Sequence, residues 1–429
     1  MATGDLPAAW QDVAQHVLAF EAGLHDCVMR VQLRFGGRLD EELLVRALDT
    51  LVADEPRVAA RFRPTRRGAV FIGPLARGAD LLRVVPASSQ PIAQLFADHD
   101  RDGPMLAAEL QRGTDDTLVL RLDHRLMDGR GRMALTARLL AVYAALRARR
   151  PLPPWPGARA PRELPAGRLL DGQRLRALAD DLRRTRQPLV AALPTIGADR
   201  VQPTYATAEV AAADLARWRD RARRRGATLT DLLVAGLLRS HAAITGAPPD
   251  GPHRCGVQVD LRRYLDDDAL HPLTNAVGMS YAQLDSLGDT AVDTLDRVLA
   301  AWGPEKDSPL FGLADIALVR PLLALPPPWI GALIRGTRRP RTDGRTAAAP
   351  ALSNVGALSF GDAERELDLR AAAVFPPINP PPGVVILAST FRGALALACG
   401  FYAGCYAPST MQRLVDGVIA EARAAAAAV

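Results

Sequence analysis

The sequence predicts an α/β protein built of two lobes. At 429 residues the chain exceeds one typical hydrophobic core and suits two domains of roughly 200 residues each. With 48% hydrophobic residues and a mean hydropathy near zero, its composition is that of a globular protein. Apolar residues alternate along residues 117–122, as on a strand, and recur at helical spacing from Arg132 onward. We therefore expect the chain to contain both strands and helices.

A proline-rich stretch divides the chain. Residues 150–156 read Arg-Pro-Leu-Pro-Pro-Trp-Pro, and the residues from there to about Pro203 have little strand character. We place the connection between the lobes in this region. The prediction is an N-terminal lobe over residues 1–185 and a C-terminal lobe over residues 186–429.

The predicted strand of the N-terminal lobe ends at a histidine. Leu118, Leu120 and Leu122 share one face of the strand with His124. Residues 124–131 contain two glycines and form the turn into the helix, where a side chain can be presented at the edge of a sheet. A histidine in this place is either a hydrogen-bonded structural residue or a general base, because its intrinsic pKa lies near neutrality.

The sequence around His124 resembles a known motif. Residues 123–129, Asp-His-Arg-Leu-Met-Asp-Gly, resemble the HHxxxDG motif of the chloramphenicol-acetyltransferase-like superfamily, which includes nonribosomal peptide condensation domains and stand-alone acyltransferases. In that superfamily the second histidine reacts. His124 occupies its position, and Asp123 replaces the first histidine. The resemblance implies two acetyltransferase-like lobes set in a V, with His124 in an active-site channel between them.

The resemblance is diffuse but extends from about Gly37 to Gly400. Residues 36–62 are similar to the opening helix of the superfamily and the strand after it, and residues 226–238 are typical of a capped, buried helix. Thr228 and Asp231 have the spacing of a capping box.

The resemblance also implies a structural ion pair at the active site. The motif aspartate, Asp128, would pair with an arginine and thereby fix the turn. The superfamily commonly has that arginine where this chain has Ala59. Arg57, Arg61 and Arg262 are the candidates to replace it.

Two asparagines stand in similar contexts in the C-terminal lobe. Asn275 lies in Leu-Thr-Asn-Ala-Val-Gly and Asn354 in Leu-Ser-Asn-Val-Gly. Either asparagine could simply form a turn. Taken in order, both fit the second lobe of the superfamily. Together with Ser353 they are candidate oxyanion donors or channel residues.

The chemistry that these residues could support is acyl transfer. Moving an acyl group from a thioester to an alcohol or amine needs a base for the nucleophile's proton and a donor for the oxyanion. His124 is the candidate base, and Gly129 gives the loop backbone freedom to approach the substrate. The sequence has no GxSxG elbow and no Cys/His pairing typical of a nucleophile. Because a thioester is already activated, no covalent enzyme intermediate is required.

The resulting hypothesis is an acyltransferase of bacterial specialised metabolism or lipid assembly. Its co-substrate would be acyl-coenzyme A or a carrier-protein phosphopantetheine thioester, with no bound cofactor. Two alternatives stay open. The same histidine could catalyse a cyclisation, dehydration or other proton transfer on a tethered intermediate, or the protein could be a catalytically silent member that binds a carrier protein.

Net charge, cysteine content and hydropathy limit the binding partners, metal sites and cellular location that we expect. A net charge of +6 favours acidic partners such as coenzyme A phosphates or an acyl carrier protein, whereas 5% aromatic residues argue against nucleic acid. The four cysteines lack metal-ligand spacing, so we expect no metal site and free thiols. Residues 1–15 do not resemble a signal sequence, and we expect no transmembrane segment and a cytoplasmic location. The apolar segment 316–334 is interrupted by Arg320 and three prolines.

Overall fold

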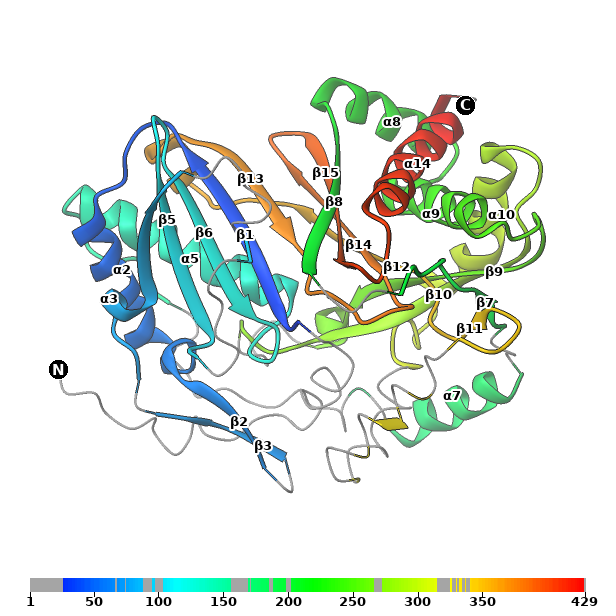
Figure 1. Cartoon of the computed structure of the whole chain (residues 1–429), viewed down its shortest axis with the longest axis horizontal. Coiled ribbons are helices and arrows are strands. Elements are labelled where there is room, and N and C mark those ends of the chain that lie inside the picture. Colours follow the sequence, from blue (N-terminus) through cyan, green and yellow to red (C-terminus); the bar gives the residue numbers. More distant parts are fainter. Residues whose placement is uncertain are drawn as a thin grey trace.

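The computed structural model of the chain forms two mixed sheets that lie next to each other (Figure 1). It describes residues 26–65, 68–73, 75–87, 103–155, 171–184, 188–197, 202–265, 272–314 and 340–427, with a few isolated positions between them. Residues 1–15, and residues 316–334 apart from four such positions, lie outside this part of the chain. No helix within the described residues has both the length and the apolar character needed to span a membrane.

The first sheet has five strands in the order β13-β1-β6-β5-β4. Its neighbours are antiparallel except for β4 and β5, which are parallel. Helices α2 and α5 pack against one face, where Leu118, Leu120 and Leu122 of β6 share a core with Leu48 and Leu139. The bounds are β1 (Val28–Phe35), β4 (Leu82–Pro86), β5 (Leu106–Arg112), β6 (Thr117–Asp123), β13 (Leu369–Phe375), α2 (Glu41–Asp54), α3 (Gly78–Leu81) and α5 (Gly129–Arg147).

The predicted strand and helix around His124 are both present, but the helix begins earlier than expected. The sequence pattern placed its start at Arg132, whereas α5 begins at Gly129. Asp128 is the N-cap, and its Oδ1 accepts a hydrogen bond of 2.9 Å from the Gly131 backbone N–H. An aspartate cap satisfies one of the orphan N–H groups of the first turn, which permits the helix to start before the apolar spacing becomes visible.

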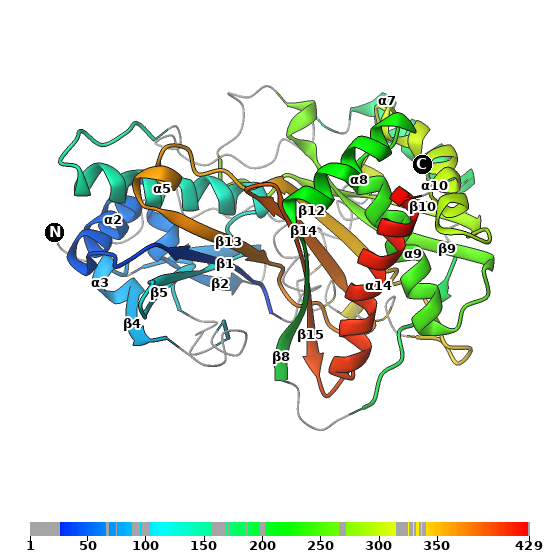
Figure 2. The same cartoon turned by 90° about the horizontal axis from the view of Figure 1, so that it is seen from above.

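The second sheet has six strands in the order β10-β9-β12-β14-β15-β8. Helices α9, α10 and α14 share its hydrophobic core, and they gather together with α8 at one end of the molecule (Figure 2). The predicted capping box is confirmed, because Thr228 and Asp231 cap α9 reciprocally. The bounds are β8 (Gln202–Val210), β9 (Asp250–Asp260), β10 (Val277–Ser286), β12 (Ala351–Ala357), β14 (Val385–Phe391), β15 (Ala394–Ala403), α8 (Ala212–Arg224), α9 (Leu229–Thr245), α10 (Ala291–Lys306) and α14 (Pro408–Ala427).

One strand from late in the sequence joins the early sheet. β13 pairs with β1 in antiparallel register, with Phe375 opposite Arg30. The first sheet therefore contains residues from both sides of position 185. The predicted lobe boundary at that position does not coincide with a division between the two sheets, and it remains a prediction. Short elements complete the described fold: η2 (Pro56–Ala59), β2 (Arg61–Thr65), β3 (Gly68–Ile72), α7 (Gly172–Arg184), β7 (Val190–Ala191), η3 (Leu261–Tyr264), β11 (Arg345–Thr346) and α13 (Ala363–Glu366).

Candidate active site

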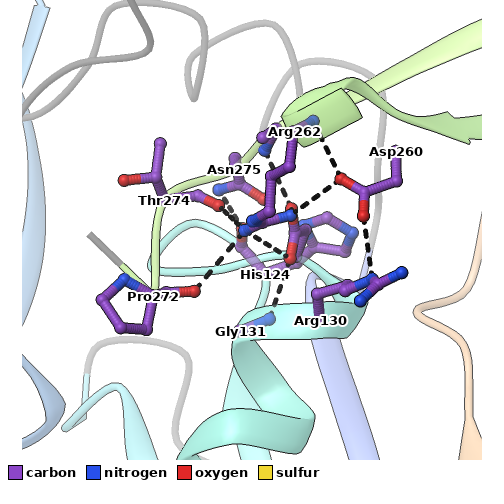
Figure 3. Close-up of polar contacts among 10 residues, drawn as sticks. His124, Arg130, Gly131, Asp260, Arg262, Pro272, Thr274 and Asn275 are labelled. Carbon is purple, nitrogen blue, oxygen red and sulfur yellow. Dashed lines mark hydrogen bonds and ion pairs between the residues drawn. The ribbon is translucent and has the colours of Figure 1, made fainter. Parts of the chain in front are cut away.

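His124 lies directly after β6, and segments from both sheets hold its backbone. Its N–H donates to the Cys27 carbonyl at 2.8 Å, beside the start of β1. Its carbonyl accepts a hydrogen bond of 2.9 Å from Asn275 Nδ2, which comes from the segment before β10 (Figure 3). The residue is buried, with 8% of its surface exposed. Two hydrogen bonds to remote segments thus fix the position of the His124 backbone, from which the imidazole projects.

The surroundings of His124 favour the neutral imidazole. Burial lowers its pKa from the ordinary 6.5, and this is the largest influence. A backbone hydrogen bond within the residue and the negative charge of Asp128 act in the opposite direction, whereas the positive charge of Arg132 lowers the pKa further. The neutral form is the one that can accept a proton, so the site is suited to a general base at neutral pH.

Asp128 connects the His124 turn to the second lobe. The residue is completely buried, and besides capping α5 it accepts a hydrogen bond of 2.8 Å from the Ala276 backbone N–H. Arg262 donates to both carboxylate oxygens, at 2.8 Å from Nη1 to Oδ2 and 3.3 Å from Nη2 to Oδ1. Of the three candidate arginines, Arg262 is therefore the one that pairs with Asp128. Arg57 of η2 pairs instead with Glu55, the N-cap residue of that short helix.

Arg262 also contacts other residues of the second lobe. Its Nη2 donates to the Thr274 carbonyl at 2.6 Å, and its Nη1 lies 3.2 Å from Asp260 Oδ1. Asp260 also pairs with Arg130 of α5 at 2.8 Å (Figure 3). Two ion pairs, Asp128–Arg262 and Arg130–Asp260, thus join the start of α5 to the segment where β9 leads into η3.

Asp123, which stands where the motif has its first histidine, is paired within its own turn. Arg125 donates from Nε to Asp123 Oδ1 at 2.9 Å and from Nη2 to Oδ2 at 2.8 Å. Both side chains are buried, and the Arg125 guanidinium lies 4.4 Å from the centroid of the Phe62 ring. This bidentate pair neutralises the buried carboxylate, so Asp123 does not present an unpaired charge to His124.

Gly129 is required for close packing rather than for its backbone angles. It is not among the glycines with positive φ. A Cβ at this position would lie 3.3 Å from Val355 Cγ1 of β12, which is tighter than most real contacts. We expected Gly129 to give the loop backbone freedom. In the structure its lack of a side chain instead allows the turn to approach the second sheet closely.

The two asparagines differ in what they contact. Asn275 binds the His124 carbonyl, whereas Asn354 donates to Thr230 Oγ1 at 2.9 Å and accepts from the Gly356 backbone N–H at 3.0 Å. Asn354 therefore forms a local turn at the irregularity of β12, one of the interpretations that the sequence left open. Ser353 is buried in the same strand. Within the described part of the chain, neither Ser353 nor Asn354 hydrogen-bonds to the His124 turn.

The described residues contain no group of three or more His, Cys, Asp or Glu side chains that could hold a metal ion. All four cysteines are free thiols. Burial raises the pKa values of Cys255 and Cys399 to about 12, so neither is a thiolate at neutral pH.

The sequence interpretation missed four charged residues of this site. Each of them lies within six residues of Asp128 or two residues of Arg262. They were missed because the motif does not reveal which residues they contact. They are Arg125, Arg130, Arg132 and Asp260. The dense arginine content around the motif was the available signal.

Comparison with solved structures identifies the fold. The TRI3 trichothecene 15-O-acetyltransferase from Fusarium sporotrichioides superimposes with a TM-score of 0.71 and 11% identity, covering 96% of this chain and 94% of that one. The first condensation domain of the calcium-dependent antibiotic synthetase gives 0.66 and 18%, covering 97% of both chains. The starter condensation domain of rhizomide synthetase, in complex with C8-CoA, gives 0.66 and 15%, covering 97% and 95%.

These similarities extend over nearly the full length of each chain. The protein therefore has the two-lobed fold of these acetyltransferase and condensation-domain structures, which is the fold that the motif resemblance implied. No family model matches the sequence, and no curated protein matches it either.

Proposed function

We propose that the protein is an acyltransferase that moves an acyl group from a coenzyme A or carrier-protein thioester to an alcohol or amine, in bacterial specialised metabolism or lipid assembly. The observation that carries this proposal is His124, a buried imidazole with a lowered pKa, held through its backbone by Cys27 and Asn275. A neutral, positioned histidine is the group that deprotonation of an alcohol or amine requires.

The reaction needs only one group to move protons. His124 takes the proton from the acceptor O–H or N–H while the acceptor oxygen or nitrogen bonds to the thioester carbonyl carbon. The tetrahedral intermediate then collapses with cleavage of the carbon–sulfur bond, and the imidazolium returns the proton to the leaving thiolate. No covalent enzyme intermediate forms, and the imidazole is neutral again at the end of each cycle.

Asp128, Gly129 and Arg262 would support this step by fixing the turn. Asp128 caps α5 and binds Arg262, while Gly129 permits the approach to Val355. Catalytic groups must be held within fractions of an ångström of their working positions, which is what such contacts provide. Asn275 would act in the same way through the His124 carbonyl rather than as an oxyanion donor.

The structural neighbours support the substrate class by analogy. One is named an O-acetyltransferase and another was determined in complex with C8-CoA. The channel between the lobes remains part of the proposal, and β12, whose Val355 lies next to Gly129, would contribute Ser353 and Asn354 to its wall. The net positive charge is compatible with coenzyme A phosphates or an acidic carrier protein.

The test is thiol release from a panel of short to long acyl-coenzyme A thioesters, with pooled alcohols and amines as acceptors. Wild type is compared with His124→Ala and with His253→Ala, which removes a different buried histidine, on β9. We expect acceptor-dependent release that His124→Ala loses by at least about 100-fold and His253→Ala retains.

Equal release by wild type and His124→Ala would overturn the role of the histidine. If no coenzyme A thioester reacts, the same comparison is made with acyl-carrier thioesters. Absence of transfer from both donors would overturn the proposed activity, and turnover of a tethered intermediate without thiol release would replace it with the proton-transfer alternative.

A further inference from the structure

Arg132 is a buried positive charge that none of the described carboxylates contacts. It lies in the first turn of α5 and is completely buried. Its Nη1 donates to the Phe375 carbonyl at 3.0 Å, whereas its Nε and Nη2 have no hydrogen-bond partner among the described residues. Burying a charged group without compensation is strongly unfavourable. An arginine at this position therefore does not contribute to stability in the way that a methionine or leucine would.

The unpartnered atoms form the edge of the guanidinium that fits a carboxylate. Nε–H and Nη2–H point in parallel, so together they match the two oxygens of a carboxylate. Three other arginines of this chain use the same edge in this way: Arg57 with Glu55, Arg125 with Asp123 and Arg225 with Asp296. In Arg132 the equivalent edge has no such partner within the described protein.

The edge lies beside the proposed catalytic turn. A Cβ built on Gly129 would be 3.8 Å from Arg132 Nη2 and 3.3 Å from Val355 Cγ1, so Nη2 lies next to the Gly129 backbone. The charge of Arg132 also acts on His124 and lowers its pKa. A negatively charged group on this edge would therefore be close to the reacting centre.

The surrounding charges leave a positive excess. Apart from the Asp123–Arg125 pair, the described residues around the turn place three guanidinium groups, those of Arg130, Arg132 and Arg262, near two carboxylates, those of Asp128 and Asp260. Arg262 and Arg130 occupy both carboxylates. The nearby hydroxyl of Tyr205 stays neutral, because burial raises its pKa far above neutrality. The negative charge of Asp128 acts on Arg132 through space, but none of the described carboxylates is hydrogen-bonded to its guanidinium group.

We propose that Arg132 binds a carboxylate of the substrate beside His124. The inference rests on the proposed acyl transfer and sharpens it, since either the acyl group or the acceptor would carry a carboxylate. A neutral substrate of the same size would leave the buried guanidinium uncompensated. The site should therefore discriminate strongly between the two, as sites with buried polar groups do.

The experiment compares wild type, Arg132→Met, Arg132→Lys and Arg138→Met. Arg138 is the matched control, a buried arginine of α5 that has its own carboxylate partner in Asp54. One arm measures transfer from succinyl-coenzyme A and butyryl-coenzyme A to neutral acceptors. The other measures transfer from butyryl-coenzyme A to amino acids and to their amides. A preference for succinyl-coenzyme A would place the carboxylate on the acyl group, and a preference for the amino acids would place it on the acceptor.

We expect wild type to prefer the carboxylate-bearing substrate in one arm, and Arg132→Met to lose that preference by about 100-fold. Arg132→Lys should keep part of the preference, because it retains the charge without the planar edge. Arg138→Met should keep all of it. Arg132→Met should unfold at the same temperature as wild type or a higher one, so loss of folding would not explain the result.

A binding measurement separates this inference from the proposed activity. Sodium butyrate is compared with butyramide, at equal ionic strength, for its effect on the thermal unfolding temperature. If no thioester reacts but butyrate raises the unfolding temperature of wild type and not of Arg132→Met, the carboxylate site stands without the acyltransferase. If transfer occurs with the same substrate preference in wild type and Arg132→Met, the carboxylate site is overturned and the acyltransferase stands.

Discussion

The two aspartates on either side of His124 are held in different ways. Asp123 pairs with Arg125, two residues away, in a contact that lies entirely within the turn. Asp128 pairs with Arg262, which is 134 residues away, and with the Ala276 backbone N–H. The first pair neutralises a local charge, whereas the second joins the His124 turn to the second lobe. The aspartate that the motif retains is therefore the one with an interlobe role.

Breaking the Asp128 contacts should have the largest effect. Asp128→Ala removes the cap of α5, the ion pair with Arg262 and the Ala276 hydrogen bond together. We expect a loss of about 3 kcal/mol in the free energy of unfolding and at least about a 100-fold loss of acyl transfer. Urea denaturation and the thiol-release assay measure the two quantities. Unchanged activity in a folded Asp128→Ala protein would contradict the interlobe role.

Breaking the Asp123 pair should affect stability more than activity. Asp123→Ala leaves the Arg125 guanidinium buried, with Phe62 as a remaining contact. We expect a loss of about 2 kcal/mol in the free energy of unfolding and about a 10-fold loss of activity. The double substitution Asp123→Ala with Arg125→Met removes both charges and should recover part of the stability. A larger loss of activity than in Asp128→Ala would reverse the comparison.

These two pairs also show how much the sequence could predict. The strand before His124, the helix after it and the capping box of α9 depend on residues within a few positions of one another, so the spacing of side chains reveals them. The choice of Arg262 over Arg57 and Arg61 depends on where β9 ends relative to α5. Packing between remote segments determines that distance, and no local pattern encodes it.

The same reason separates the two asparagines. Asn354 forms a turn with Gly356, two residues away, and the local sequence suggested this. Asn275 contacts a carbonyl 151 residues away, which only the assembled lobes bring into reach. Arg132 was not singled out because an arginine in a helix normally reaches solvent, and its burial depends on how β13 joins the first sheet.

Asn275 offers a smaller perturbation of the same interlobe contact. Asn275→Ala removes the hydrogen bond to the His124 carbonyl and leaves the Asp128–Arg262 pair in place. We expect a loss of about 1 kcal/mol in the free energy of unfolding and a loss of activity of about 10-fold or less. Thermal unfolding and steady-state kinetics measure both. A loss of activity as large as that of Asp128→Ala would show that Asn275 acts on the substrate directly.

The smallest expected effect is on the titration of His124. Because burial lowers its pKa below 6.5, the active neutral form persists to lower pH than for an exposed histidine. The rate of acyl transfer should be constant above about pH 6.5 and fall only as the pH drops through the lowered pKa. Asp128 and Asp123 both raise the pKa, Asp128 more strongly, so Asp128→Asn should lower it further than Asp123→Asn does. NMR titration of the imidazole in wild type and both variants measures these shifts independently of activity. Equal shifts in the two variants would mean that the interlobe aspartate has no greater electrostatic influence on His124 than the local one, and that its importance is purely positional.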